Sequence, residues 1–180
     1  MQTWELLPHP ASPPTDVRGV SASLLTPVDG WLRLRWRVEG ARALLVPPFA
    51  GRGRADGLWQ TTCFELFVQP AGGDSYSEFN FSPSDRWAAY DFRGRREGMA
   101  ERPVPRQPVC TMRAGRDLAI LDVALPLAAL PAGDCAVGLT AVIEEAGGVK
   151  SWWALAHNGT APDFHDPACF TASLAAPIAP

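Results

Sequence analysis

The sequence has a single lysine, no clustered cysteines and no long apolar run. Lys150 is that lysine, and the net charge is −3 over 180 residues. This balance gives no basic surface for nucleic acid, so no nucleic-acid partner is expected. No apolar run approaches the ~20 residues of a membrane helix, so no membrane partner is expected either.

The cysteines and the first residues bear on the compartment. The four cysteines lie far apart and form no C-x-x-C motif. The stretch MQTWELLPHP has no basic start followed by an apolar segment, so no secretory signal is predicted. We therefore expect a cytoplasmic protein in which the thiols are small buried groups, not disulfides or zinc ligands.

Motifs of the common enzyme classes are missing too. The chain has no G-x-S-x-G, no glycine-rich phosphate loop and no H-E-x-x-H. His157 and His165 stand eight residues apart in a proline-containing loop with Asp163 and Asp166, a spacing that matches no usual zinc site. We expect these side chains to cap turns. The sequence predicts neither a metal site nor an enzyme.

One pair of acids keeps an enzymatic alternative open. Glu65 and Glu78 fall on adjacent predicted strands, where they can share a sheet face. Two carboxyl groups roughly 5–9 Å apart are what glycoside hydrolysis requires. Acids on a sheet face serve far more often as hydrogen-bond acceptors or as solvated groups. The alternative fails if the two side chains point to opposite faces.

Eighteen prolines and sixteen glycines leave few windows long enough for a helix. Between them lie alternating or apolar runs of strand length, without the alternation of strands and helices that a parallel sheet needs. We predict nine or ten strands and one helical turn within 126–133, in a single all-β domain, an antiparallel, jelly-roll-like β-sandwich. The predicted strand runs are 31–38, 43–47, 61–69, 76–81, 86–92, 108–114, 117–127, 134–145, 150–156 and 169–175.

Alternation along 61–69 and along the hairpin 76–92 divides their side chains between two faces. Along 61–69 one face carries Phe64, Leu66 and Val68, and the other carries Glu65 and Phe67. In the hairpin, Phe79 and Phe81 are predicted to pack in the core, opposite Tyr76, Glu78 and Asn80.

Seven tryptophans are many for this length. Trp36 lies on the apolar face of its strand and is predicted to be core. Trp59 follows the loop GRGRADG and precedes a strand, which places it at the rim of a sheet. Trp152 and Trp153 must point to opposite faces, and periodicity does not choose which one is core. An aromatic ring at a rim is well suited to stack on the C–H face of a sugar.

Three stretches resemble bacterial DOMON-like domains, which are related to family 9 carbohydrate-binding modules. They are LWQTTCFELFVQP (58–70), YSEFNFSPSDRWAAYDFRGRREGM (76–99) and SWWALAHNGTAPDFHDPACF (151–170). The resemblance covers about 31–175. It implies a sandwich in which two tryptophans enclose a sugar, with Trp59 as the first and Trp152 or Trp153 as the second.

We therefore predict a non-catalytic domain that binds a carbohydrate or a similar small polar ligand. The resemblance also implies a haem-binding alternative, and a protein-interaction domain is a third possibility; no cofactor is expected for the leading hypothesis. The only haem donors available would be Met99, Met112, His157 and His165. The candidate ligand-binding residues are Trp59, Glu65, Glu78, Asn80, Trp152, Trp153 and His157.

Overall fold

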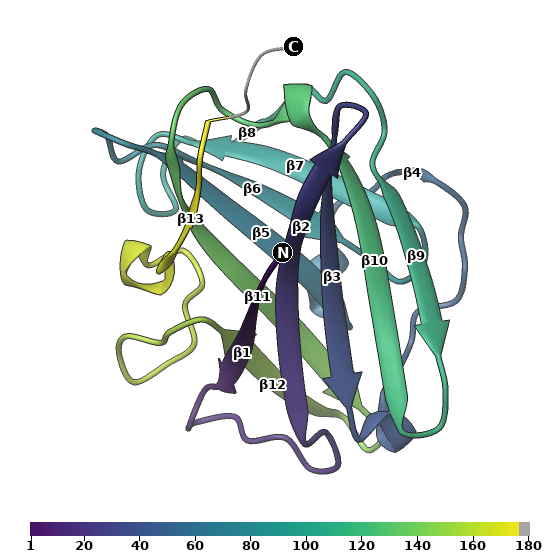
Figure 1. The fold of residues 1–180 in the computed structure, drawn as a ribbon. Helices are drawn as coiled ribbons and strands as arrows, with labels where there is room; N and C mark the ends of the chain where they lie inside the picture. Colours follow the sequence, from purple (N-terminus) through teal and green to yellow (C-terminus); the bar gives the residue numbers. More distant parts are fainter. Residues whose placement is uncertain (177–180) are drawn as a thin grey trace.

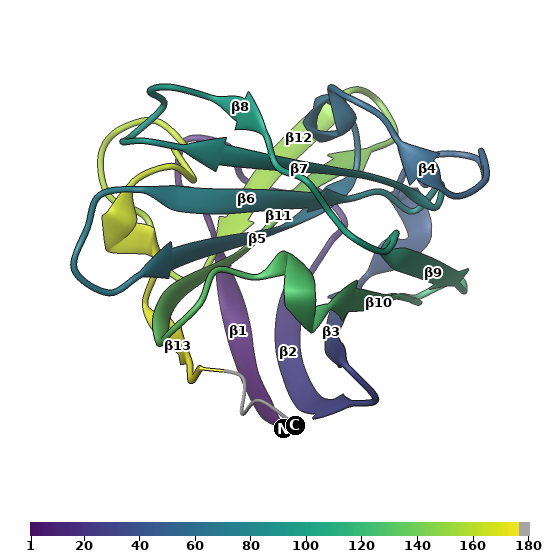
Figure 2. The same ribbon diagram turned by 90° about the horizontal axis from the view of Figure 1, so that it is seen from above.

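The computed structural model describes residues 1–176, which fold into two β-sheets packed face to face (Figure 1). Within these residues the chain forms thirteen strands and four short 3-10 helices, and no α-helix. Figure 2 shows the two layers edge on. The all-β sandwich predicted from the sequence is confirmed.

The first sheet holds five strands in a meander-like order. In spatial order they are β1 (Gln2–Pro8), β2 (Gly19–Val28), β3 (Trp31–Glu39), β10 (Leu118–Pro126) and β9 (Val109–Ala114). Every pair in this sheet is antiparallel.

The second sheet carries the candidate site. Its spatial order is β4 (Gly53–Arg54), β7 (Arg86–Phe92), β6 (Tyr76–Phe81), β5 (Cys63–Pro70), β11 (Cys135–Glu145) and β12 (Val149–Ala154). Two short strands attach to it, β8 (Ala100–Glu101) on β7 and β13 (Ala172–Leu174) on β11. The 3-10 helices are η1 (Ala41–Ala43), η2 (Leu58–Gln60), η3 (Leu127–Ala129) and η4 (Pro167–Cys169). The helical turn predicted within 126–133 is η3.

Strand β1 belongs to both sheets. Its residues Gln2–Leu6 pair with β2, whereas Leu7 and Pro8 pair with Ala154 and Trp153 of β12. This strand and β2 were not among the predicted runs, and the core also takes Leu6, Val20 and Leu24 from them. The core therefore begins well before the residues that the family resemblance covers.

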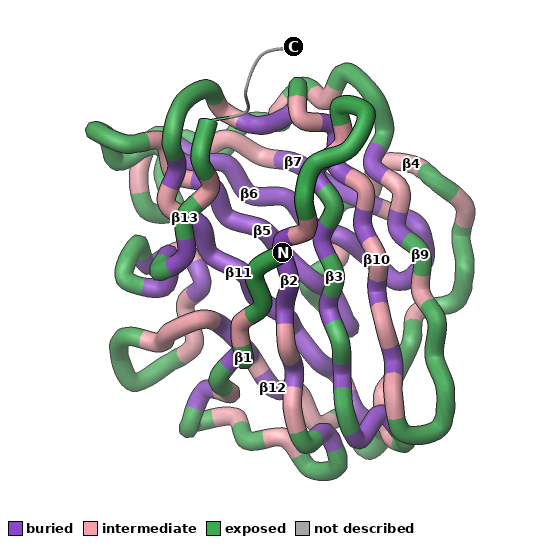
Figure 3. Tube along the Cα trace, viewed as in Figure 1, coloured by how far each residue is buried: buried purple, intermediate pink, exposed green. Residues whose placement is uncertain are grey.

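The main core lies between the two sheets, and Figure 3 shows buried segments along strands of both. Phe79 and Phe81, which were predicted to be core, are fully buried there, and so are Phe64, Leu66 and Val68, which share one face of their strand. Trp36 lies between Phe64 and Phe81, at ring-centroid distances of 5.7 and 6.1 Å. The alternation of the sequence thus assigned this face correctly.

The prediction of a short buried strand at 43–47 is wrong. Ala43 ends η1, and Leu45 and Val46 are exposed. The run forms a single isolated bridge to the end of β11: the Leu45 N–H donates to the Glu144 carbonyl, and the Ala43 carbonyl accepts from the Ala146 N–H. Pro47 and Pro48 follow and have no N–H to extend the pairing, so the apolar residues stay in a surface loop.

A second cluster lies on the outer face of the second sheet, under the segment 155–171. Its members are Phe67, Tyr76, Phe92, Val142, Ala154, Phe164, Cys169 and Phe170. Phe67 stacks on Phe170 with centroids 5.5 Å apart, and Tyr76 stacks on Phe92 at 4.9 Å. The segment therefore covers one end of this face and leaves the other end open.

Gly138 on β11 is where the covering segment comes closest to the sheet. A Cβ at this position would lie 2.6 Å from Phe170 Cδ1 and 3.3 Å from Phe67 Cβ. We expect Gly138→Ala to lower stability by about 1–3 kcal/mol, because the Phe170 ring must move. This corresponds to a fall in Tm of roughly 2–12 °C for a chain of this length, measurable by thermal unfolding.

The control for that variant is Gly19→Ala on β2. Nothing lies within 4 Å of a Cβ at Gly19, and its φ is not positive. Its Tm should stay near that of the wild type. If both variants melt alike, the close approach of Phe170 to β11 is not a tight contact.

Candidate functional site

A cleft of about 840 Å³ opens on the uncovered part of the outer face of the second sheet. Five strands of that sheet supply its floor, and three loops supply its walls. The floor is made by Glu65, Glu78, Tyr90, Val142 and Trp152. The walls are the loop 54–59 before β5, the loop 96–101 between β7 and β8, and residues 162–165 of the covering segment.

Trp59 stands in the wall formed by η2. Gly57 begins this single turn with a φ of 70°, a conformation that glycine adopts without strain, and its carbonyl accepts from the Gln60 N–H. The turn is also held by Lys150, whose Nζ donates to the Gln60 carbonyl. The indole is 54% exposed, the largest exposed fraction of any tryptophan in the described residues, whereas Trp36, Trp87 and Trp153 are buried. This is the rim position predicted for it.

Trp152 and Trp153 do point to opposite faces of β12. Trp153 is 2% exposed in the main core, and its Nε1 donates to Ser151 Oγ at 2.8 Å. Trp152 lines the cleft and packs against the second cluster. Trp153 is therefore not placed to contact a ligand, and the candidate from this pair is Trp152.

Glu65 and Glu78 share the face that was predicted for them, and both lie on the floor of the cleft. They are only 3% and 6% exposed. Thr140 Oγ1 donates to Glu65 Oε2 at 3.1 Å, and Asn80 Nδ2 donates to Glu78 Oε1 at 2.7 Å. Burial and the neighbouring acid raise the pKa of Glu65 well above its usual range, and burial raises the pKa of Glu78 to about 7.

Besides Trp153, two more of the predicted site residues lie outside the lining of the cleft. Asn80 is 1% exposed beneath the floor and reaches the site through Glu78. His157 packs edge-on against His9, with ring centroids 4.9 Å apart, and its Nε2 lies 2.8 Å from the Leu7 carbonyl oxygen. We infer that His157 holds the end of β1 and is not brought to the cleft.

Other lining residues were not predicted. Tyr90 Oη donates to Asp56 Oδ1 at 2.5 Å, and Arg54 pairs with Asp56 at 3.0 Å and with Glu101 at 3.2 Å. The guanidinium of Arg54 also lies over the Tyr90 ring, 5.3 Å from its centroid. These contacts join the loop before β5 to β7 and β8, and so fix one wall of the cleft.

The opposite wall is organised by His165. Its Nδ1 lies 2.7 Å from Tyr76 Oη, which also accepts from the Arg96 backbone N–H. Its Nε2 lies 3.7 Å from Glu78 Oε2. Burial, together with the charge of Arg96, lowers the pKa of His165 to about 4, so the imidazole is neutral at pH 7.

No protein-family model matches the sequence, and neither does any curated protein. Solved structures do match. A "putative carbohydrate-binding protein" from Bacteroides uniformis superposes with a TM-score of 0.66 at 18% identity, over 97% of this chain and 85% of that one. A family 9 carbohydrate-binding module from Caldicellulosiruptor kristjanssonii, in complex with cellotriose, gives 0.57 at 12%, over 94% and 84%.

A glucose complex of a family 9 module from the same organism gives 0.52 at 11% identity, over 91% of this chain and 78% of that one. The chain shares the fold of these proteins. At these identities the likeness establishes the sandwich and its topology. It supports the expected relation to family 9 modules, and the expected relation to DOMON-like domains stays a prediction.

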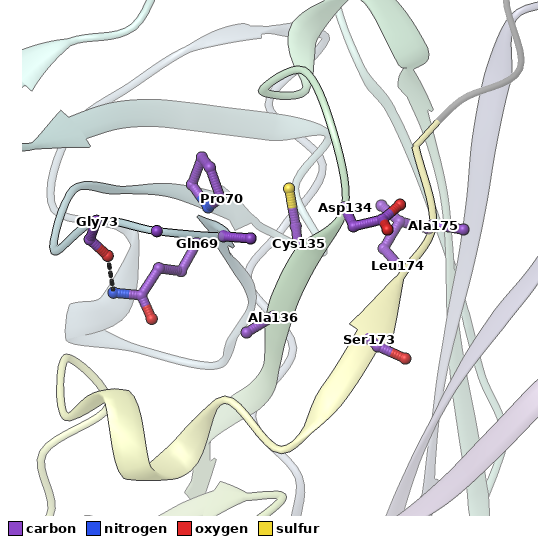
Figure 4. A pocket seen from close by; sticks show the side chains of 11 residues that line it. Gln69, Pro70, Gly73, Asp134, Cys135, Ala136, Ser173, Leu174 and Ala175 are labelled. Atoms are coloured by element: carbon purple, nitrogen blue, oxygen red, sulfur yellow. Dashed lines mark hydrogen bonds between the residues drawn. The ribbon is translucent and has the colours of Figure 1, made fainter.

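A smaller hollow of about 390 Å³ lies between the β5–β6 turn, the start of β11 and β13 (Figure 4). At the β5–β6 turn, Gln69 Nε2 donates to the Gly73 carbonyl at 3.3 Å. Asp134 Oδ1 already accepts a hydrogen bond from the Ala176 N–H. No aromatic side chain lines this hollow, so the larger cleft is the better candidate.

The acids of the loop 157–167 make protein contacts. Asp163 pairs with Arg95 and Arg96, and Asp166 accepts from the Ala168 N–H as the cap of η4, which is the capping role predicted for the loop. In residues 1–176 no three histidine, cysteine or acidic side chains gather as a metal site requires. In the same residues no helix is long and apolar enough to cross a membrane.

The four haem donors named from the sequence do not converge. Met112 packs against the core between the sheets, whereas Met99 and His165 line the cleft. His157 lies outside the cleft, against His9.

Proposed function

We propose that the chain is a non-catalytic carbohydrate-binding domain whose ligand lies in the cleft between Trp59 and Trp152. The observation that carries the proposal is an exposed indole at the mouth of a cleft with hydrogen-bonding groups on its floor. A sugar presents C–H faces to such rings and hydroxyl groups to such a floor. The similarity to carbohydrate-binding proteins, two of them holding cellotriose or glucose, supports the same ligand class.

A binding role fits the two acids better than glycoside hydrolysis does. Hydrolysis needs one carboxyl group that stays ionised and a second that donates a proton. Burial raises the pKa of both Glu65 and Glu78, so neither acid is fully ionised at pH 7. Carboxyl groups that are protonated, or that share a proton, still form good hydrogen bonds with hydroxyl groups. The concave shape of the site also favours a small ligand over a docked protein surface.

The test is a panel of sugars, including glucose and cellotriose, titrated while tryptophan fluorescence and Tm are followed. Trp59 is exposed in the free protein, so a stacked sugar should change its emission. A ligand at 100 times its Kd adds about 2.7 kcal/mol of stability, which is roughly 5–11 °C in Tm for this length. A panel that changes neither signal would refute the proposal.

A further inference from the structure

The cations of the cleft are paired with carboxylates, whereas the acids of its floor are not paired with cations. Arg54 contacts Asp56 and Glu101, and Arg96 contacts Asp163 at 2.8 Å. Within residues 1–176, neither Glu65 nor Glu78 forms an ion pair with arginine or lysine. Two basic groups are near them: His165, whose Nε2 lies 3.7 Å from Glu78 Oε2, and Arg96, whose charge lowers the pKa of both acids without forming an ion pair with either.

The acids also leave hydrogen-bonding capacity open. Asn80 Nδ2 is used by Glu78, but the buried Asn80 Oδ1 has no partner in the described part of the chain. Thr140 donates to Glu65 Oε2 only. The floor therefore presents acceptor oxygens from two carboxyl groups, with the unpartnered Asn80 Oδ1 buried beneath them, and few donors reach these oxygens.

The other ionisable groups around the acids do not supply the missing positive charge. Cys63 and Tyr76 stay neutral because burial raises the pKa of each, and burial together with Asp56 does the same for Tyr90. His165 is neutral, as described above. Arg96 is the nearest cation on the walls, and its guanidinium is already bound to Asp163.

On the basis of the carbohydrate-binding function above, we propose that the cleft prefers a sugar that carries a primary ammonium group, held against Glu65 and Glu78. An ammonium group has three donors and no acceptor, which matches a floor of acceptor oxygens. Its charge offsets the cost of a buried carboxylate. Trp59 and Trp152 line the same cleft, where an indole face can add cation–π attraction to this group.

Binding would then be linked to protons. In the free protein the raised pKa values mean that the folded acids hold protons that the unfolded chain has lost, so stability falls as pH rises from about 4.5 through 7. An ammonium ligand favours the ionised acids, and the displaced proton leaves to solvent. Affinity should therefore rise with pH over this range while the ligand stays charged.

The experiment is calorimetric titration at pH 6, where the sugar amino groups are largely protonated, with a β-1,4-linked glucosamine disaccharide, its N-acetylated form and the matching glucose disaccharide. We expect the ammonium sugar to bind about tenfold or more tightly than either neutral sugar. We also expect its heat to depend on the ionisation enthalpy of the buffer, which reports proton release. The neutral sugars should show no such dependence.

Two substitutions test whether the preference for the ammonium sugar depends on Glu65 and Glu78 and not on the overall charge of the protein. Glu78→Gln and Glu65→Gln should each reduce the preference for the ammonium sugar to about threefold or less, since an amide cannot ionise. Glu39→Gln is the control, because Glu39 is exposed on the first sheet and pairs only with Arg37. It should leave the preference unchanged.

The outcomes distinguish this inference from the function on which it rests. Neutral sugars that bind as tightly as the ammonium sugar would overturn the inference and leave the carbohydrate-binding function standing. A preference that survives both Glu→Gln changes would also overturn it. Failure of all three sugars and of the wider panel would refute both.

Discussion

Replacing Trp59 with alanine is expected to weaken sugar binding by between about 30-fold and 150-fold without changing the fold. The side chain is 54% exposed, so a stacked ligand can cover about half of its surface. An indole offers ~150–250 Å², so half of it, at ~25 cal/mol per Å², contributes roughly 2–3 kcal/mol. Since 1.4 kcal/mol is a factor of ten, affinity falls by that range. Titration by calorimetry measures it.

Two further variants make this prediction specific. Trp31→Ala removes an indole from the outer face of the first sheet, where it packs under Arg106, and should leave affinity unchanged. Trp59→Phe keeps a smaller aromatic face and should recover part of the lost affinity. Equal affinity of Trp59→Ala and wild type would exclude stacking at this rim.

The face assignments of the second sheet were predictable because strict alternation leaves no choice. Once Phe79 is placed in the core, Glu78 and Asn80 must lie on the opposite side. The sequence does not show how deep they lie. Depth depends on what covers the face, and the covering segment 155–171 is a loop without periodicity. This is why Asn80 was expected to contact ligand and is found beneath the floor instead.

The sequence of β12 alone does not show whether Trp152 or Trp153 faces the core, because its alternation is compatible with either. The pairing of β12 with the neighbouring strands shows which one does. Trp153 lies opposite Ala141 of β11 and Pro8 of β1, on the core side of the second sheet. Because β1 was not predicted at all, that contact was not available to the sequence argument.

The walls of the cleft were missed for the same physical reason. Arg54 ends the two-residue strand β4, and Arg96 and His165 stand in loops. Each is placed by a partner distant in sequence, namely Glu101, Asp163 and Tyr76. Strand β2 was missed because its buried positions are partly small residues, Ala22 among them, and its outer face is serine. The difference in hydrophobicity between the two faces of β2 is therefore small, and the strand is stabilised by tertiary contacts that the local sequence does not show.

The largest stability effect is expected at Glu145, the last residue of β11. Its side chain is fully buried, and its two oxygens accept from the backbone N–H groups of Thr15, Asp16 and Val17 at 2.9, 2.6 and 3.0 Å. These bonds fix the loop between β1 and β2 against the second sheet. Glu145→Ala leaves three donors without their acceptor, which we expect to cost about 3–5 kcal/mol, or roughly 6–20 °C in Tm.

Glu144→Ala is the matched control, because Glu144 lies one position earlier on the same strand with its side chain on the other face. In residues 1–176 that side chain makes no hydrogen bond or ion pair, so its loss should cost less than about 1 kcal/mol. Glu145→Gln tests the role of charge: one amide oxygen replaces two carboxylate oxygens, and its NH₂ meets an N–H donor, so most of the loss should persist. Thermal and urea unfolding of the three variants measure the differences. A Glu145→Ala protein as stable as Glu144→Ala would mean that water replaces the carboxylate and that the β1–β2 loop does not depend on this anchor.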